Sequence, residues 1–595
     1  MGLIKELFYQ GDYQQVLQRT FEDQNRIDLS LFSYIIGSLS FLGRIQEAES
    51  LYTVHKLKLT PVQKSYSYFF LALAWTRRSQ YERAKKYLIL NRALSKKGNA
   101  EDHEIRFLVQ QGISFFLFFL GKFEKSLAWS EQSLTSAIAT HDFWIRALSQ
   151  DLLANNLIQN GRINEGLSYF TEALKNSIKL KNQALINAIE ISSVVLSCEY
   201  GINLAESYQK LITYSKNKKQ IDSFSIANLG LEHARQLTLR GEWKEAMVKL
   251  NEISNSIFQN QNRRQEARFN LRWAEIYFLK NEPDTCMHYI RSGRRCLEFV
   301  DHTYEMQFIG LEIKVAETLL NQDVPQNLIT RLNELRAKFN NVKNNNILAR
   351  HPSWKNALAQ PSDDEIHHLL EKAQQNPKAA RKIIFETGYF SWLYRFFDLD
   401  RGQKYILLNL EPKSITYITG DGICHKPGEL STLNYKIIAK LAQGYTTKED
   451  LVNSVWGYRY DPLRHDSLIY SAFSALRKVF SEDSRMIETS EVGYSLSAQV
   501  INLLETSTPE SDLKIIPMPQ KSDLSGLLEL GLNSRQIQIL QFLDKNQFIS
   551  VKMVLKLFST SEITANRDLR TLFQKNLVLR IGQGRATHYT KAGPL

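Results

Sequence analysis

A three-position phrase recurs along the first 340 residues of this chain and limits what they can fold into. It consists of a small residue, an aromatic or aliphatic residue two positions later, and a second small residue five positions after the first. Successive copies begin 32 to 42 residues apart, a period that indicates a solenoid of stacked helical units. The copies begin at Gly11, Gly43, Ser79, Gly121, Gly161, Tyr200, Gly241 and Asn281, and the copy at Tyr200 fits the phrase less well.

The phrase predicts a tight turn between two antiparallel helices, as in the copy formed by Gly241, Trp243 and Ala246. The glycine ends one helix, the aromatic ring fills the corner, and the small residue lets the second helix lie close to the first. Each helical hairpin leaves an apolar face uncovered until the next hairpin packs on it, so we expect the units to be stable only together.

The phrase that begins Gly11-Asp12-Tyr13 and continues to Val16 resembles tetratricopeptide repeats, in the longer form of about forty residues found in regulatory proteins. Such arrays bind extended peptides, other proteins or small inducers on a concave face, so we expect a peptide or protein ligand here. The aromatic residues expected to serve in packing between helices include Phe115, Phe116, Phe118 and Phe119. The basic residues interpreted as a solvated helix face are Arg263, Arg264, Arg268 and Arg272.

The order of the remaining segments follows from breaks in this pattern. Residues 341–402 are rich in Asn at their start and are predicted to be a linker and a helical connector, with one helix beginning at Pro377. Residues 403–500 change to short strands, three helices and a hairpin. Residues 501–524 contain three prolines and several Ser and Thr, and are predicted to be a flexible linker.

The last segment, residues 525–595, is predicted to form three short helices and a hairpin, the plan of a winged helix. Ser559 and Glu562 match a capping box, which predicts that the third helix starts abruptly after a short turn, as in a helix-turn-helix. The residues expected on the inner face of this helix are Ala565, Leu569 and Leu572. The residues expected on its outer face include Ile563, Asn566, Arg567 and Arg570.

The charge of this last segment favours a polyanionic partner. Between residues 525 and 595 there are ten Lys and Arg but four Asp and Glu. The predicted hairpin adds Arg580, Arg585 and His588 around Gly582 and Gly584, which suits a wing lying along a phosphate backbone. A winged helix used only for protein contacts is the alternative interpretation.

The string from Ser561 through Leu572, followed by the Gly-Gln-Gly-Arg wing, resembles the winged helices at the C-termini of RecG-like helicases and in DeoR-type regulators. The resemblance covers about sixty residues and implies binding to double-stranded DNA. The residues expected to enter the major groove are Thr564, Asn566, Arg567 and Arg570. The residues expected to contact phosphates are Arg580 and Arg585.

The string from Lys448 to Tyr458, with the later Leu476-Arg477-Lys478 and Gly493-Tyr494, resembles the OmpR/PhoB effector domain. In that family the strands, helices and wing form one DNA-binding unit that often works in tandem dimers, which suggests a homodimer. The resemblance also places a contact with RNA polymerase in the loop of residues 456–465. Its candidate contact residues are Tyr458, Arg459, Tyr460 and Arg464.

This first winged helix departs from its family where DNA contacts are expected. Ser467 and Ala475 stand where the family commonly has Arg, and Glu491 stands near the position of a phosphate-binding Arg. Residues 403–500 carry eleven bases and eleven acids, so little counterion release is expected on DNA. DNA binding and protein docking both remain open for this domain. The residues expected to contact DNA, if it binds, are His465, Tyr470, Ser471, Ser474 and Lys478.

Several function classes find no support in the sequence. No phosphate-binding loop, GxGxxG, GxSxG or HExxH motif occurs, and no cofactor, metal site or enzymatic activity is expected. The four cysteines form no CxxC pair. The longest apolar run is far below the roughly twenty residues that a membrane helix needs, so we expect no membrane association and a cytoplasmic location. The formal net charge is +13.

Together these features predict a mainly α-helical protein, in which a tetratricopeptide-like solenoid at 1–340 precedes two winged helix-turn-helix domains at 403–500 and 525–595. The predicted function is that of a DNA-binding transcriptional regulator with a sensing or protein-interaction array. The alternative is an interaction scaffold whose winged helices bind proteins.

Overall fold

The computed structural model forms two compact units, Met1–Arg401 and Gly402–Leu595. Among the helices that the structure describes, none is long and apolar enough to cross a lipid bilayer. The described residues are 2–21, 27–97, 102–216, 221–297, 302–320, 322–340, 377–397, 399–410, 413–480, 486–503, 514–515, 532, 534–546, 548–558, 562–575, 577–581 and 587–591.

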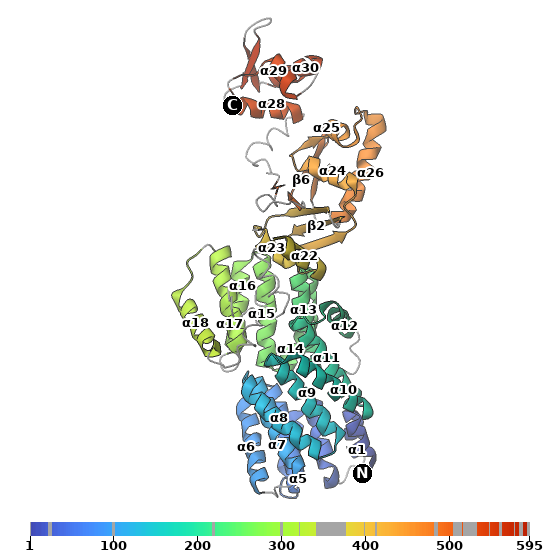
Figure 1. Ribbon diagram of the computed structural model, residues 1–595, viewed down its shortest axis with the longest axis vertical. Helices are drawn as coiled ribbons and strands as arrows, with labels where there is room; N and C mark the ends of the chain where they lie inside the picture. The colour runs from blue at the N-terminus through green and yellow to red at the C-terminus, as the bar shows by residue number, and fades with distance from the viewer. Residues whose placement is uncertain are drawn as a thin grey trace. The chain divides into compact units, whose positions relative to one another are not determined.

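The first unit is an array of antiparallel helical hairpins, and neighbouring helices such as α15, α16, α17 and α18 lie side by side (Figure 1). The predicted solenoid is therefore confirmed. Its helices are α1 Gly2–Tyr9, α2 Tyr13–Phe21, α3 Phe32–Phe41, α4 Ile45–His55, α5 Pro61–Arg77, α6 Tyr81–Lys97, α7 His103–Phe119, α8 Phe123–Ala139, α9 Phe143–Gln159, α10 Ile163–Lys179, α11 Gln183–Glu199, α12 Leu204–Lys216, α13 Ser223–Arg240, α14 Trp243–Asn260, α15 Arg263–Leu279, α16 Pro283–Cys296, α17 His302–Lys314 and α18 Gln326–Asn340.

Each position of the repeated phrase has the predicted role. The first residue adopts a left-handed backbone conformation, with φ of 85° at Gly241, and ends the first helix of the hairpin. The residue two positions later begins the second helix, as Trp243 begins α14. The residue five positions after the first is fully buried against the first helix, as at Ala246. At Gly166 an added Cβ would lie 2.5 Å from a side-chain carbon of Ile158, so the two helices approach closely there.

The imperfect copy near residue 200 has a structural explanation. Its left-handed residue is Gly201, one position later than the pattern places it. Asn203 is left-handed as well, and α12 begins only at Leu204. Four residues, 200–203, separate α11 from α12, which is one more than in most of the other turns, and this displaces the phrase from its register.

A second periodic signal sets the start of the first helix in five of the hairpins. Five Asp or Asn side chains, spaced forty residues apart, accept hydrogen bonds from backbone N–H groups in the first turn of the helix that follows them. Such N-caps satisfy donors that have no partner within the helix. The capping residues are Asp102, Asp142, Asn182, Asp222 and Asn262.

Three of these capping residues also form hydrogen bonds across the coil of the array, that is, between helices that are far apart in sequence. Asn182 Nδ2 donates to the carbonyl oxygen of Tyr9 at 2.9 Å, and the Tyr9 hydroxyl donates to Asp142 Oδ2 at 2.7 Å. Asn262 Nδ2 donates to the carbonyl oxygen of Arg77, and the next backbone N–H donates to Ser79 Oγ at 3.0 Å. Helices that lie 133 to 185 residues apart in sequence are therefore bonded to each other.

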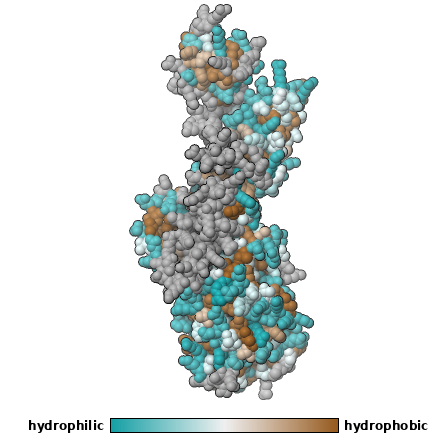
Figure 2. Space-filling model, viewed as in Figure 1, coloured by the Kyte–Doolittle hydropathy of each residue, from teal (hydrophilic) through white to brown (hydrophobic). Residues whose placement is uncertain are grey.

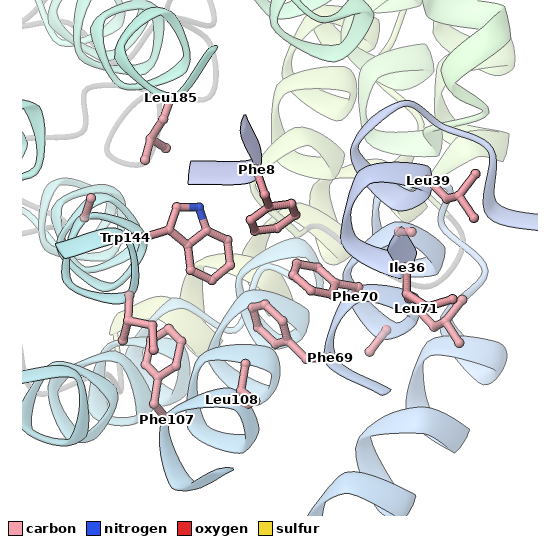
Figure 3. Packing of buried hydrophobic residues seen from close by; sticks show 14 of the residues in the cluster. Phe8, Ile36, Leu39, Phe69, Phe70, Leu71, Phe107, Leu108, Trp144 and Leu185 are labelled. Atoms are coloured by element: carbon pink, nitrogen blue, oxygen red, sulfur yellow. The ribbon is translucent and has the colours of Figure 1, made fainter. Parts of the chain in front are cut away.

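Aromatic packing surrounds the first of these contacts (Figure 3). Phe8 of α1 lies between Trp144 of α9 and Phe70 of α5, with ring centroids 5.5 and 6.1 Å away. All three rings are buried. Gly37 of α3 allows this approach, because an added Cβ would lie within 3 Å of the rings of Phe8 and Phe70.

The segment predicted as a connector is part of the array unit. Helix α22 (Pro377–Thr387) begins at Pro377 as predicted, and η4 (Phe390–Trp392) and α23 (Leu393–Phe396) follow it. The hydroxyl of buried Tyr389 donates to Gln236 Oε1 at 3.2 Å, and Tyr394 stacks on Trp243. The end of the connector therefore packs on the apolar faces of α13 and α14.

The domain predicted at residues 403–500 contains the expected strands and helices. Strands β3, β2, β1, β7 and β8 form one sheet in that order, in which β1 runs parallel to β7, and β4, β6 and β5 form another. The elements are β1 Tyr405–Leu410, β2 Lys413–Thr419, β3 Gly422–Pro427, α24 Thr432–Leu441, β4 Thr446–Thr447, α25 Lys448–Leu451, η5 Val452–Trp456, α26 Pro462–Phe480, β5 Ile487–Thr489, β6 Gly493–Leu496, β7 Gln499–Leu503 and β8 Lys514–Ile515.

Two features of this domain differ from the prediction. The sequence pattern predicts a third helix over Asp466–Phe480, whereas α26 begins four residues earlier, at Pro462, because proline is favoured in the first helical turn. Strands β7 and β8 lie partly in the segment predicted as a flexible linker, with Ile501 paired to Ile515. Val500 and Ile501 are buried, and this burial explains why β7 joins the sheet.

The C-terminal domain has the predicted three helices and a hairpin. Its elements are α28 Ser534–Lys545, α29 Val551–Phe558, α30 Glu562–Gln574, β9 Val578–Ile581 and β10 His588–Lys591. Strands β9 and β10 are antiparallel, and Ile549 forms an additional bridge to Tyr589. Ser559, predicted to cap the third helix, lies outside the described residues.

The bonds across the coil lead to a prediction about local stability. Replacing Asn262 with Ala should remove both the cap of α15 and the bond to the Arg77 carbonyl, which together stabilise by roughly 2 kcal/mol. Hydrogen exchange measured by mass spectrometry should then become faster in the turn at residues 76–80. Asp222→Ala is the matched control, because it removes a cap that makes no bond to that turn. Equal exchange in the two variants would contradict a stabilising contact across the coil.

Candidate nucleic-acid interface

The inner side of helix α30 is fixed by apolar packing and by one buried carboxylate. Ala565, Leu569 and Leu572 are fully buried, as predicted. Asp568, also fully buried, accepts hydrogen bonds from Arg535 Nε at 2.7 Å and from Gln536 Nε2 at 3.1 Å. Both partners belong to α28, so a charge-assisted pair sets the orientation of α30 on its own domain. The sequence places Arg535 among the bases of this domain but does not indicate its bond to Asp568.

The outer side of α30 carries the predicted polar and basic residues. Arg567 and Arg570 are exposed, and within the described residues neither guanidinium has an acidic partner. Asn566 is exposed and donates to the Glu562 carbonyl at 3.0 Å, leaving its side-chain oxygen available as an acceptor. Thr564 is half-buried near the start of the helix. The side chain of Ile563 lies outside the described residues.

The wing places one predicted cation on an exposed strand. Arg580 lies on β9 opposite Tyr589 of β10 and is exposed. Arg585, Gly582 and Gly584 lie outside the described residues. The neighbours of Arg580 are apolar, with Leu579 53% and Ile581 46% exposed, and apolar atoms are visible on this domain in Figure 2. The sequence analysis did not single out these two exposed side chains.

Helix α26 has an apolar inner face and a largely polar outer face. The buried residues of its inner face include Ile469, Phe473, Leu476 and Phe480. Its outer face exposes Ser467 and four of the predicted DNA contacts, Tyr470, Ser471, Ser474 and Lys478. The wing approaches this helix, because the guanidinium of Arg477 donates to Thr489 Oγ1. Glu491 is exposed in the wing.

A hydrogen-bonded cluster occupies the N-terminal half of this outer face. Lys448 Nζ lies 3.1 Å from Asp466 Oδ2 and 3.3 Å from the Tyr470 hydroxyl, and 5.1 Å from the centre of the Tyr470 ring. The Tyr460 hydroxyl donates to Asp466 Oδ1 at 2.6 Å. The hydrogen bond from Tyr460, together with that from Lys448, lowers the pKa of Asp466. Tyr470 is therefore held in place, and the charge of Lys448 is largely compensated by Asp466.

His465 and the preceding loop are arranged as a turn. His465 Nδ1 accepts a hydrogen bond from the Asp461 backbone N–H at 2.9 Å, and its ring stacks on Tyr458 at 5.7 Å. Tyr458 and Arg464 are exposed as expected, whereas Tyr460 is half-buried by its bond to Asp466. Leu463, which the sequence analysis did not single out, is 96% exposed in this turn.

Comparison with known proteins identifies the C-terminal domain. Residues 535–591 match the family described as DeoR-like helix-turn-helix domain. No curated protein matches the chain. A solved structure, titled as the crystal structure of a Rap protein complexed with Competence and Sporulation Factor, matches at 12% identity, with a TM-score of 0.28. That match covers 67% of this chain and 95% of the other.

The Asp568 pair leads to a prediction about the stability of helix α30. Replacing Asp568 with Ala should deprive Arg535 and Gln536 of their shared acceptor and destabilise the packing of α30 by about 3 kcal/mol. Amide hydrogen exchange in α30 should become faster by about two orders of magnitude. Gln574→Ala removes an exposed polar side chain from the last turn of the same helix and should leave that exchange nearly unchanged. Similar exchange rates in both variants would show that the pair does not hold α30.

Proposed function

We propose that this chain is a transcriptional regulator whose C-terminal winged helix binds double-stranded DNA and whose helical array receives the controlling signal. The observation that carries the proposal is the exposed face of α30 in a domain that matches DeoR-like helix-turn-helix domains. Asn566 and Arg567 present the hydrogen-bonding groups that read base edges. Arg580 on the wing suits contact with a phosphate.

The first winged helix has a secondary role in this proposal. Its order of strands, helices and wing fits the OmpR/PhoB resemblance, but the exposed face of α26 is largely uncharged. Ser471, Ser474 and Lys478 remain the proposed DNA contacts, together with Tyr470 and His465. Exposed Tyr458, Leu463 and Arg464 suit a contact with RNA polymerase, and the same resemblance supports a homodimer on DNA.

A second candidate function is that of an interaction scaffold. The exposed apolar side chains of Leu579 and Ile581 favour it, because water-exposed apolar residues on a wing are suited to bind a protein. A scaffold would bind no DNA fragment in a salt-sensitive way, so DNA titrations over a salt series separate the two functions.

The proposed recognition face leads to a prediction about DNA binding. With a preferred site selected from pooled genomic fragments, Arg567→Ala should reduce the preference for that site, at a cost of about 1–3 kcal/mol. Arg580→Ala should weaken binding to all sequences alike and lower the salt-dependence slope by about 0.9. We expect Arg585→Ala to weaken binding in the same way, and Asn566→Ala to relax the preference for the selected site. Fluorescence anisotropy over a salt series measures both quantities.

Arg92→Ala is the matched control, because it removes an exposed Arg from the outer helix α6 of the array. Arg92→Ala should change neither the preference for the selected DNA site nor the slope of the salt dependence. If Arg567→Ala leaves both the affinity and the preference at the level of this control, the proposed recognition face is incorrect.

The first winged helix can be tested after the C-terminal domain is disabled. In a chain carrying Arg567→Ala and Arg580→Ala, the further change Asp466→Asn should release Lys448 and strengthen residual DNA binding by a few-fold at low salt. Asp421→Asn, at the exposed β2–β3 turn, adds the same charge elsewhere in the domain and is the control. Equal binding by the two variants would argue against DNA contact by α26.

A further inference from the structure

The first helices of successive hairpins surround a cavity inside the array. Residues of α3, α5, α7, α9, α11, α13, α15 and α17 line it, and water molecules can place their centres in about 210 Å³ of it. The bonds across the coil close this space on one side, because Asn262 at the start of α15 is bonded to the end of α5. Both Asn262 and the adjoining Arg77 are among the lining residues.

The cavity wall is rich in aromatic rings and contains three arginines. The guanidinium of Arg77 lies over the rings of Phe115 and Phe224, at 5.8 and 5.4 Å from their centres. The guanidinium of Arg264 lies over the rings of Phe118 and Tyr304, at 5.7 and 5.5 Å. These ring contacts hold the guanidinium groups in fixed orientations. The run of arginines interpreted from the sequence as a solvated face thus supplies Arg264 and Arg268 to the cavity, while Arg272 is buried against Glu275.

The hydrogen-bonding capacity of two of these arginines is incompletely used. Within the described residues, the shielded Nε atoms of Arg77 and Arg268 donate to no acceptor. Arg268 donates through Nη1 to Asn228 at 3.1 Å, whereas the Arg77 side chain has no hydrogen-bond acceptor in that part of the chain. Buried donors without acceptors are costly, so an anion that accepts from them would be bound favourably.

The acidic side chains of the wall do not cancel this positive charge. They are Asp151 of α9 and Glu199 of α11, against Arg77, Arg264 and Arg268. Burial raises the pKa of Asp151 to about 7, although Arg77 and a hydrogen bond from Asn155 oppose the shift. Asp151 is therefore largely neutral below pH 7, and the wall then carries a larger net positive charge.

We propose that this cavity binds a small organic carboxylate with an aromatic or branched aliphatic body. The carboxylate would accept hydrogen bonds from Arg77, since a planar guanidinium fits a planar carboxylate. The body would lie among the rings of Phe115, Phe119 and Phe224. A small molecule fits a cavity that is closed on one side better than an extended chain does, because an extended peptide needs an open groove along which to lie. This proposal rests on the proposed function, in which the array receives a controlling signal, and it takes the carboxylate to be that signal.

The test uses the dialysed full-length chain and calorimetric titration with three probes of the same shape. Indole-3-acetate carries the carboxylate, indole-3-acetamide is its neutral counterpart, and tryptamine is the cation. Phenylacetate and 4-methylvalerate, each compared with its own amide, extend the acid series to a smaller ring and a branched chain. We expect at least one acid to bind more than tenfold more tightly than its matched amide, and tryptamine not to bind. If no acid binds better than its neutral counterpart, the proposal is overturned.

Variants locate the binding site. Arg77→Met should weaken binding of the acid by about tenfold to a hundredfold, whereas Arg92→Met outside the cavity should have no effect. Ser192→Phe should block binding by filling the space, and serves as a second variant if Arg77→Met does not fold, as judged by circular dichroism. Undiminished binding to a folded variant of either kind would overturn the proposal. A short peptide that binds in the cavity while every acid fails would do so as well.

The pH dependence supplies an independent readout. Binding of the acid should weaken as the pH rises from 6 to 8, because ionised Asp151 then competes for Arg77 and repels the carboxylate. Asp151→Asn should abolish this dependence and keep the affinity at its value at low pH. If binding of the acid to the Asp151→Asn variant still depends on pH, ionisation of Asp151 is not the cause of the pH dependence. These titrations need no DNA, so their failure would leave the DNA-binding proposal standing, and the reverse also holds.

Discussion

The helical array depends on capping side chains that form bonds in two directions. Asn182 and Asn262 accept hydrogen bonds from the first turns of α11 and α15, and each donates through its amide nitrogen to a carbonyl in an earlier part of the coil. An Asp at either position could cap the helix but could not donate to that carbonyl. The same two residues therefore start a helix and fix the spacing between turns, and the enclosed cavity follows from that spacing.

A buried acid has a comparable role at the other end of the chain. Asp568 lies one position from Arg567 in sequence, but it faces inward and binds α28. Its negative charge is neutralised inside the domain, so Asp568 does not compete for the exposed arginines on the outer face of α30. In the first winged helix the arrangement is reversed, since Asp466 lies on the outer face and binds Lys448.

The sequence predicted the features that depend on neighbouring residues. The repeated phrase is local, and it located the hairpin turns and the buried small residues such as Ala246. The helical spacing of apolar residues in α26 and α30 likewise predicted which side of each helix is buried. The forty-residue spacing of the caps is present in the sequence, but it was not recognised because many other Asp and Asn residues surround it. The role of Gly201 was missed because one inserted residue changes the register.

Contacts between distant residues could not be predicted in the same way. Nothing near Asn262 in sequence indicates its bond to the Arg77 carbonyl, 185 residues away. The count of charges predicted a basic C-terminal domain but could not assign Arg535 to Asp568 or Lys448 to Asp466. For the same reason Arg264 and Arg268 were placed on a solvated face, although the coil brings them to a wall that they share with Arg77.

The bonds across the coil also limit how such an array can change in length. A simple stack of hairpins can gain or lose one unit, because each unit contacts only its neighbours. Here Tyr9 meets Asn182 and Arg77 meets Asn262, at separations of 173 and 185 residues. One duplicated hairpin between these partners would move each carbonyl acceptor out of reach of its donor, so both hydrogen bonds would be lost. Duplications and deletions in this region should therefore be tolerated only when they preserve both pairings, which makes the number of hairpins a fixed property of the protein.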